Sequence, residues 1–310
     1  MSDAAKYRLV TRSDFDGLVC AVLLKELDIL DEIKFVHPKD MQDGKIAITE
    51  RDITTNLPYV DGAHLVFDHH LSETIRVGQK PNYIIDPSAP SAARVVYDYY
   101  GGKERFPTIS DAMMAAVDQA DSARYEKGDI LDPTDWTLLN FIMDARTGLG
   151  RFREFRVSNY QLMMDLIDYC GKHSIAEILA LPDVVERVEL YTQHADRFVD
   201  QLKRCSTLRG NVVVLDLRNE ETIFAGNRFM IYALYPETNV SIHVLWGLKQ
   251  QNTVLACGKS IINRSSRTDI GPLMLEYGGG GHQAAGTCQV ANDQAADALE
   301  AIVARLQADG

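Results

Sequence analysis

Strand-like and helix-like patterns alternate along the first 100 residues of the chain. Apolar runs such as Tyr7–Thr11 and His64–Asp68 are predicted to be short strands, and Leu18–Leu30 and Ala92–Tyr100 are predicted to be helices. This alternation is typical of a mostly parallel sheet with helices on both faces. Further strands of this α/β domain are predicted at Ile33–His37, Ile46–Asp52 and Tyr83–Asp86.

The pattern becomes largely helical between residues 109 and 205, and it ends in one long amphipathic helix. Apolar positions recur there every three or four residues and therefore share one helical face; they are Val184, Val188, Tyr191, Ala195, Phe198 and Leu202. A break at residues 208–211 precedes new strand-like segments, at Asn211–Leu215, Val240–Leu245 and Val254–Gly258. We therefore predict a first domain over residues 1–188, a linker helix over 189–208 and a smaller α/β domain with a mixed sheet over 209–310.

Composition narrows the class of protein. The chain has 310 residues, of which 46% are hydrophobic and 25% charged, an ordinary globular balance. Its first residues, M-S-D-A-A-K-Y-R, lack the apolar core of a signal peptide, and no apolar run is long enough for a transmembrane helix, so we expect a cytoplasmic protein without a membrane partner. The five cysteines are scattered without a C-x-x-C pair, which disfavours a disulfide framework or a thiolate zinc site.

The net charge of −12 bears on the choice of ligand. A protein that grips long duplex DNA normally carries a basic stripe, and the sequence shows none. An acidic protein can still bind phosphates where metal ions and a few arginines supply positive charge locally. The composition therefore disfavours long duplex DNA and favours small phosphorylated ligands.

Acidic residues follow several of the predicted strands. Asp14 and Asp16 come after the first strand, Asp52 ends another, and the triplet D-H-H at residues 68–70 ends the run Leu65-Val66-Phe67. Ligands of open parallel sheets bind outside the carboxyl ends of the strands, so these groups are expected to converge. Crowded carboxylates need a cation, and oxygen ligands with imidazole suit Mn²⁺, Mg²⁺ or iron.

Two motifs make the sequence resemble a known family. The triplet D-H-H at 68–70, with D-F-D-G at 14–17 upstream, resembles the DHH phosphoesterase superfamily. About 210 residues later, G-G-G-G-H-Q-A-A-G at 278–286 resembles the signature of the DHH-associated C-terminal domain. The motifs occur in the family's order, and the resemblance covers nearly the whole chain.

The resemblance implies a dinuclear metal site that holds two Mn²⁺ ions, with Mg²⁺ or another divalent metal as alternatives. For the last ligand we favour Asp121, within D-S-A-R-Y at 121–125, over Asp118. A metal pair of this kind can activate a bridging water and bind a phosphoryl group. The implied ligands are Asp14, Asp16, Asp52, His69 and Asp121.

Three further residues are assigned to the catalytic side of the site. Asp68 is expected to orient an imidazole, and His70 to lie beside the scissile phosphate or to support a ligand. Arg12 stands where many members of the family carry a metal-binding His or Asp, and arginine cannot ligate a metal. One of the two metals would then have fewer protein ligands, or would bind only together with the substrate. Alternatively, Arg12 neutralises the aspartates or contacts a substrate phosphate.

The resemblance places substrate binding in the C-terminal domain. Glycines can adopt positive φ and expose successive N–H groups as an anion-binding nest, and His282 can donate to a phosphate oxygen. Arg264 is favoured over Arg267 as the phosphate-binding arginine, because arginine suits bidentate contact. The predicted substrate-binding residues are Arg264, Asn263, Gly279, Gly280, Gly281 and His282.

These inferences predict a metal-dependent hydrolase that cleaves a phosphodiester or phosphoanhydride in a short oligonucleotide, a dinucleotide or a polyphosphate end. The alternative is a catalytically weakened DHH-type module that binds nucleotides, and Arg12 motivates it. By resemblance we also expect a homodimer. Apolar residues within Phe152–Cys170 offer either a contact surface or ordinary core.

Overall fold

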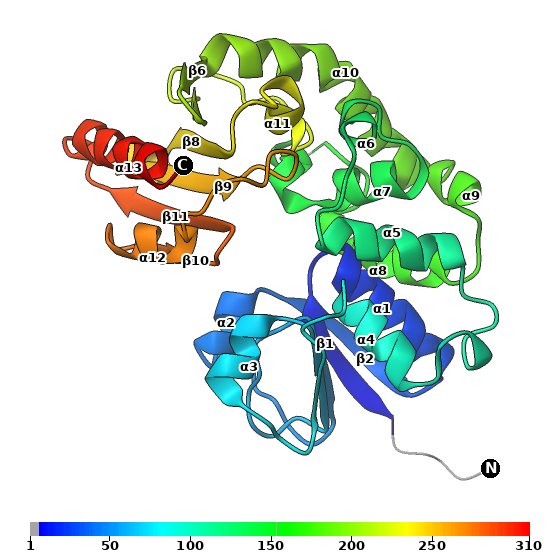
Figure 1. The fold of residues 1–310 in the computed structure, drawn as a ribbon. Helices are drawn as coiled ribbons and strands as arrows, with labels where there is room; N and C mark the ends of the chain where they lie inside the picture. The colour runs from blue at the N-terminus through cyan, green and yellow to red at the C-terminus, as the bar shows by residue number, and fades with distance from the viewer. Residues whose placement is uncertain (1–5, 153) are drawn as a thin grey trace, which may run out of the picture. The chain divides into compact units, whose positions relative to one another are not determined.

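The computed structural model describes residues 6–152 and 154–310, which form two compact units (Figure 1). The chain passes from one unit to the other within the long helix α10 (Pro182–Cys205), between Glu189 and Leu190. Two short upstream segments, Tyr125–Pro133 and Arg146–Gly148, also belong to the second unit. The first unit comprises the chain up to Arg124, Thr134–Ala145 and Leu149–Glu189.

The first unit is built on a five-stranded sheet in the order β2-β1-β3-β4-β5, with every neighbouring pair parallel. The strands are β1 (Tyr7–Arg12), β2 (Leu30–Val36), β3 (Asp52–Thr55), β4 (Leu65–Asp68) and β5 (Tyr83–Ile85). Helices cover both faces in Figure 1, with α1 and α4 on one face and α2 and α3 on the other. These helices are α1 (Phe15–Glu26), α2 (Pro38–Gln42), α3 (Leu71–Val77) and α4 (Ala92–Tyr99). The predicted parallel α/β sheet is confirmed.

Further helices complete the first unit and its connection to the second. They are α5 (Asp111–Asp121), α6 (Lys127–Leu131), α7 (Asp135–Met143), α8 (Asn159–Cys170) and α9 (Ile175–Leu179). Short 3-10 helices lie at Gly102–Glu104, Ala145–Thr147, Leu149–Arg151 and Leu248–Gln250. Within the described ranges, no helix has the length and apolarity that a membrane span requires.

Helix α8 bears on one of the alternatives raised by the sequence. Its apolar side chains are buried within the chain's own core; they are Leu162, Met163, Leu166, Ile167 and Cys170. Burial of each large apolar side chain contributes about 1.5–3 kcal/mol to folding. These five side chains are therefore part of the core, whereas Phe155 and Val157 of the same stretch are only half-buried.

One strand was misplaced by the sequence pattern. The apolar run that begins at Ile46 was predicted to continue as a strand to Asp52, yet the strand begins at Asp52 and runs to Thr55. Ile46 and Ile48 instead pack against a small buried cluster that includes Val10 and Met41. The true strand carries two threonines, and Thr55 donates from Oγ1 to Thr11 Oγ1 at 2.6 Å, so hydroxyl pairing replaces an apolar pattern.

The second unit contains a six-stranded mixed sheet in the order β10-β11-β9-β8-β7-β6, in which only β7 and β8 are parallel among the described strands. Its strands are β6 (Ser206–Arg209), β7 (Val212–Asp216), β8 (Val240–Trp246), β9 (Thr253–Lys259), β10 (Gly280–Gly281) and β11 (Ala285–Val290). Its helices include α11 (Met230–Leu234), α12 (Ile270–Leu275) and α13 (Ala295–Asp309). The sheet, α12 and α13 share one apolar core, which confirms the predicted α/β fold with a mixed sheet.

The glycine run forms the edge of this sheet and is not an open nest. Only Gly278 has positive φ, at 73°, among the run's four glycines. The N–H groups of Gly278, Gly279 and His282 donate to backbone carbonyls, so they are not available to bind an anion. A Cβ on Gly281 would lie 2.3 Å from the carbonyl oxygen of Ala285. Close packing against β11 therefore requires glycine at 279 and 281, where an added Cβ would meet backbone atoms.

This packing predicts different effects for two adjacent alanine substitutions. Gly281→Ala should lower the free energy of unfolding by about 1–3 kcal/mol, because the new Cβ meets backbone that cannot move aside. Gly280→Ala is the matched control, since a Cβ there meets nothing within 4 Å. Urea denaturation of the full chain measures both, and equal stabilities for the two variants would contradict this account.

Candidate active site

The D-F-D-G motif places two aspartates at the carboxyl end of β1. Asp14 is the N-cap of α1, and its Oδ1 accepts a hydrogen bond from the Gly17 N–H at 3.0 Å. Gly17 has no room for a side chain, because a Cβ would lie 2.0 Å from the carbonyl oxygen of Arg12. The tight turn from strand to helix therefore explains the glycine, and it fixes both carboxylates.

Asp16 is almost fully buried, with 2% of its surface exposed. Its two oxygens accept the N–H groups of Ala92 and Ala93 at 3.0 and 2.7 Å, at the start of α4, where a helix favours negative charge. Burial and the nearby charge of Asp121 nevertheless raise the pKa of Asp16 well above its ordinary value. The predicted cap of α4, Ser91, is confirmed, since its side chain accepts the N–H of Arg94.

His69 follows β4 and points one ring nitrogen toward the acids. Its Nδ1 lies 3.2 Å from the carbonyl oxygen of Ala89, which can only accept, so Nδ1 carries the hydrogen. Its Nε2 lies 2.8 Å from Asp121 Oδ2. Burial lowers the pKa of His69, but the hydrogen bond and charge of Asp121, with the charge of Asp16, outweigh it and raise this pKa to about 9.

The structure distinguishes the two candidate acids at the end of α5. Asp121 faces His69, and burial acts to raise its pKa, yet the hydrogen bond and charge of His69 lower it. Asp118 instead accepts from Ser91 Oγ at 2.7 Å and from Arg94 Nη2 at 2.6 Å. Asp118 is therefore occupied in holding α4 and α5 together, and Asp121 is the acid that joins the site.

Asp16, His69 and Asp121 form a set of ligand atoms suited to a divalent cation. One atom from each lies within 4.8 Å of the others. In neutral His69 the Nδ1 hydrogen points to a carbonyl, so the Nε2 lone pair faces the two carboxylates, as a metal ligand requires. The residues present therefore fit Mn²⁺ or Mg²⁺, with oxygen and imidazole as ligands.

The first residue of the triplet supports the third. Asp68 has no exposed surface, and its Oδ1 lies 2.7 Å from His70 Nδ1. Its Oδ2 accepts the hydroxyl of Tyr83 at 2.9 Å. Asp68 thus fixes the orientation of the His70 ring, and because Oδ1 is an acceptor, Nδ1 of His70 carries a hydrogen. The side chain of His70 keeps 32% exposure.

Asp52 lies away from these residues, which corrects its prediction as a metal ligand. It is the first residue of β3 and pairs in register with Arg8, whereas Asp14 follows the opposite end of β1. The Asp52 carboxylate accepts from Arg8 Nε at 2.6 Å and from the Thr49 N–H. The misplaced strand caused the error, since Asp52 ends the predicted strand but begins the real one.

Asn56 occupies the carboxyl end of β3, and the sequence analysis missed it. It is 1% exposed and has φ of 53°, a left-handed conformation that asparagine tolerates. Its Nδ2 lies 3.2 Å from Asp14 Oδ1, and Arg12 Nε lies 2.9 Å from Asp14 Oδ2. The available signal was a polar residue directly after Thr54-Thr55, which marks a strand end once the strand is placed correctly.

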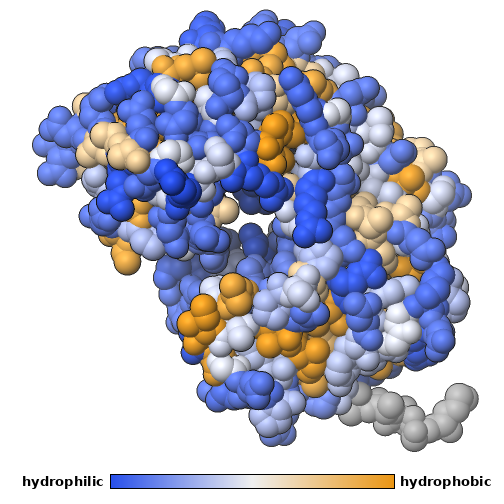
Figure 2. Space-filling view, in the orientation of Figure 1, coloured by the Kyte–Doolittle hydropathy of each residue, from blue (hydrophilic) through white to orange (hydrophobic). Residues whose placement is uncertain are grey.

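Hydrophobic surface adjoins this site on α3. Leu71 directly follows His70 and has 64% of its surface exposed, and Ile75, one helical turn later, has 81%. Figure 2 shows hydrophobic surface over this part of the first unit. Ligand sites commonly combine apolar surface with a few polar groups. The neighbourhood of His70 therefore offers apolar contact as well as charge.

The predicted substrate residues occur in two segments of the second unit: Asn263 and Arg264 lie in the loop after β9, and Gly280 and Gly281 form β10. Asn263 donates from Nδ2 to the Glu237 carbonyl at 3.1 Å, and Arg264 donates from Nε to the Ile261 carbonyl at 3.0 Å. Both contacts are to the backbone, and they hold the loop in place. His282 is exposed directly after β10.

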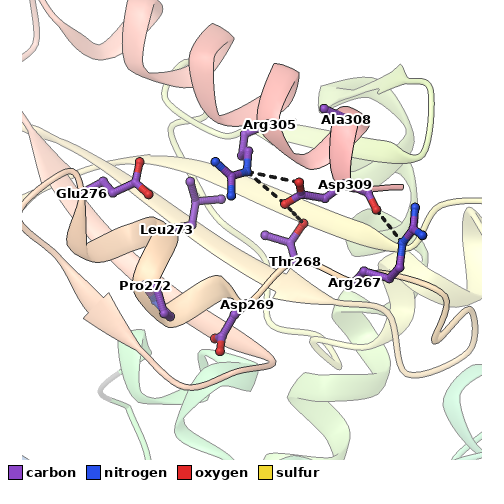
Figure 3. A pocket seen from close by; sticks show the side chains of 9 residues that line it. All are labelled: Arg267, Thr268, Asp269, Pro272, Leu273, Glu276, Arg305, Ala308 and Asp309. Atoms are coloured by element: carbon purple, nitrogen blue, oxygen red, sulfur yellow. Dashed lines mark hydrogen bonds and ion pairs between the residues drawn. The ribbon is translucent and has the colours of Figure 1, made fainter.

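Arg267, the rival of Arg264, lines a pocket of about 500 Å³ in the second unit (Figure 3). Its Nε donates to the Asp309 carbonyl at 2.9 Å, and Arg305 pairs with the Asp309 carboxylate at 3.1 Å. Asp269 and Glu276 also line the pocket, so its charges are mixed. Arg267 therefore anchors the end of α13, and the pocket offers no excess of positive charge for a phosphate.

Comparisons with solved structures give one strong and several distant similarities. The chain is 62% identical to the pGpG-specific phosphodiesterase PggH from Vibrio cholerae, over 98% of this chain and 100% of that one, with a TM-score of 0.88. RecJ from Thermus thermophilus, solved with Mn²⁺, shares 14% identity over 96% of this chain and 52% of its own, with a TM-score of 0.51. CDC45 from Entamoeba histolytica shares 8% identity over 98% of this chain and 95% of its own, with a TM-score of 0.53. The last two similarities concern the fold alone. No protein-family model and no curated protein matches the chain.

The contact between His69 and Asp121 predicts a pH dependence of the metal-free protein. Because the pKa of folded His69 is about 9 and its ordinary value is 6.5, the folded state retains a proton that the unfolded state loses between these values. This contribution to the free energy of unfolding is present below pH 6.5 and is lost as the pH rises through about 9.

An NMR titration of the His69 ring in chelator-treated protein measures this pKa directly. Asp121→Asn should lower the midpoint, because burial is then opposed only by the charge of Asp16 and the Ala89 carbonyl. Asp118→Asn, on the same helix, is the matched control and should leave the midpoint in place. A larger shift with Asp118→Asn would reverse the assignment of the two acids.

Proposed function

The chain belongs to the DHH phosphoesterase superfamily, and we propose that it is a metal-dependent phosphodiesterase whose substrate is the linear dinucleotide pGpG. The 62% identity to PggH, over 98% of the chain, is the observation that carries the proposal. The group of Asp16, His69 and Asp121 supports it, because two acids and an imidazole close together are suited to divalent metal chemistry. The reaction is the hydrolysis of the single phosphodiester into two molecules of GMP.

Asp16, His69 and Asp121 would hold the divalent ion, and we assign Mn²⁺ or Mg²⁺ to this place. When bound, such an ion lowers the pKa of a water molecule and polarises a phosphoryl oxygen. The helix start at Ala92 and Ala93 keeps Asp16 in one orientation, and the Ala89 carbonyl keeps His69 in one tautomer. The chain's own contribution is thus a rigid arrangement of ligands that needs little reorganisation.

His70 is our candidate for proton transfer at the leaving oxygen. Asp68 holds its Nδ1–H, so Nε2 is the nitrogen that can hold or release a proton. The buried Asp68, itself held by Tyr83, keeps the ring in one orientation. The His70 side chain is partly exposed, so a ligand can reach it.

The second unit supplies substrate contacts in this proposal. Arg264, Asn263 and His282 lie on exposed or half-exposed loops, and the Arg264 guanidinium is suited to a phosphate. Gly279 and Gly281 serve by letting the chain pack closely against β11, and Gly280 lies between them in the sequence, with His282 directly after Gly281. The cytoplasmic location and the homodimer expected from the sequence stay predictions.

A weakened nucleotide-binding module remains the second candidate, because Arg12 forms an ion pair with Asp14 where a metal ligand was expected. The two functions differ in turnover. An enzyme converts pGpG to GMP only with a divalent metal, whereas a binding module retains pGpG without conversion.

Hydrolysis of pGpG with and without Mn²⁺ tests the proposal. We expect conversion to GMP that stops with a chelator, and slower conversion of cyclic di-GMP, of longer oligoribonucleotides and of polyphosphate. His69→Ala and Asp121→Asn should each reduce kcat/KM at least about 100-fold, because each removes a metal-binding group.

Asp52→Asn provides the control, because this acid lies at the opposite end of the same sheet. The kcat/KM of this variant should stay within about two-fold of that of the unchanged chain. Its free energy of unfolding should fall, because the ion pair with Arg8 is lost. Tight retention of pGpG with no turnover under any metal would favour the binding module. Full activity in His69→Ala would refute the assignment of the site.

A further inference from the structure

The carboxylate of Asp14 is already surrounded by positive and donor groups of the chain. Arg12 Nε lies 2.9 Å from its Oδ2, and the Gly17 N–H and Asn56 Nδ2 donate to its Oδ1 at 3.0 and 3.2 Å. Asn56 carries an amide where a third carboxylate would give a divalent cation a stronger ligand. Asp14 therefore differs from Asp16, which shares its place with two other metal-binding groups.

A second metal ion beside the first would need further acidic ligands. Asp68 is occupied by Tyr83, His70 and the N–H of His69, and Asp52 is at the other end of the sheet. Among the described residues, the only group of three or more metal-binding side chains is Asp16, His69 and Asp121. The contacts of Asp14 with an amide and a guanidinium are thus a poor start for a second divalent-cation site.

We propose that Arg12 replaces a second metal ion in this site. A single divalent ion is held by Asp16, His69 and Asp121, and the Arg12 guanidinium, which forms an ion pair with Asp14, supplies the second positive charge to the phosphodiester. The inference rests on the proposed phosphodiesterase function and changes its metal content from two ions to one.

The position and chemistry of Arg12 support this role. It is the last residue of β1, so it lies at the strand end from which Asp14 and Asp16 follow. Its side chain is 34% exposed, which leaves it within reach of a ligand. The guanidinium carries five N–H donors, and the ion pair with Asp14 uses Nε, so the terminal groups are suited to phosphate oxygens. Its positive charge also acts on Asp121, across the metal-binding group.

The number of bound ions tests the proposal without reference to turnover. The full chain is stripped with a chelator and titrated with Mn²⁺ alone, and free Mn²⁺ is counted by electron paramagnetic resonance. We expect one ion per chain, both without ligand and with a non-hydrolysable phosphorothioate analogue of pGpG. Two ions per chain, in either condition, would overturn the inference.

A double variant tests whether Arg12 and Asn56 are the reason that only one ion binds. Arg12→Asp with Asn56→Asp places three carboxylates around the Asp14 position and should raise the count to two ions per chain. Arg8→Ala is the matched control, because Arg8 forms the same kind of ion pair, with Asp52, four residues earlier on the same strand. It should leave the count at one. If the double variant does not fold, the count in the unchanged chain still decides the matter.

Arg12→Ala separates the role in phosphate binding from a structural role. This variant should still bind one Mn²⁺, and bind it several-fold tighter, because a nearby positive charge is removed. With pGpG, kcat should fall about 100-fold or more, since an interaction with the reacting phosphate is lost. Unchanged kcat with one bound ion would contradict the proposal, as would loss of the bound ion.

The outcomes also separate this inference from the proposed function. Two bound ions with metal-dependent hydrolysis of pGpG would leave the phosphodiesterase intact and remove only the role of Arg12. No bound ion and no turnover would remove the phosphodiesterase itself. One bound ion, with hydrolysis that depends on Arg12, supports both.

Discussion

The repulsion between two neighbouring carboxylates, the buried Asp16 and the half-buried Asp121, is the constraint on which the rest of the site depends. Both lie beside His69, in surroundings that raise the pKa of Asp16 and keep the His69 ring charged when no metal is present. A protonated imidazole balances part of this charge, and a divalent cation would balance it more fully. The site is thus a place where positive charge stabilises the fold, which is also what phosphoryl chemistry needs.

The parallel sheet creates this constraint through its register. Strands β1, β3 and β4 run in the same direction, so the residues after their carboxyl ends lie at one edge. Gly17 permits the tight turn into α1, and the start of α4 donates two N–H groups to Asp16. The same edge brings Arg12 and Asn56 to Asp14. The two neighbouring aspartates therefore have different partners: Asp16 faces His69 and Asp121, and Asp14 faces the Arg12 guanidinium.

The sequence predicted those parts of the site that follow clear strands. Leu65-Val66-Phe67 is an apolar strand, so His69 was placed correctly at its end, and the D-F-D-G motif placed Asp16. Strand β3 has threonines in place of an apolar run, and its pairing through hydroxyl groups cannot be read from hydrophobicity. Asp52 was therefore chosen in place of Asn56. The glycine run was read as a ligand nest because tight packing against β11 appears only in three dimensions.

The most direct test of the account is a crystal structure of the Mn²⁺-soaked protein with anomalous scattering at the manganese edge. The account predicts one peak per chain, bounded by Asp16, Asp121 and the Nε2 atom of His69, with the Arg12 guanidinium still on Asp14. A peak between Asp14 and Asn56, or one at Asp52, would contradict it.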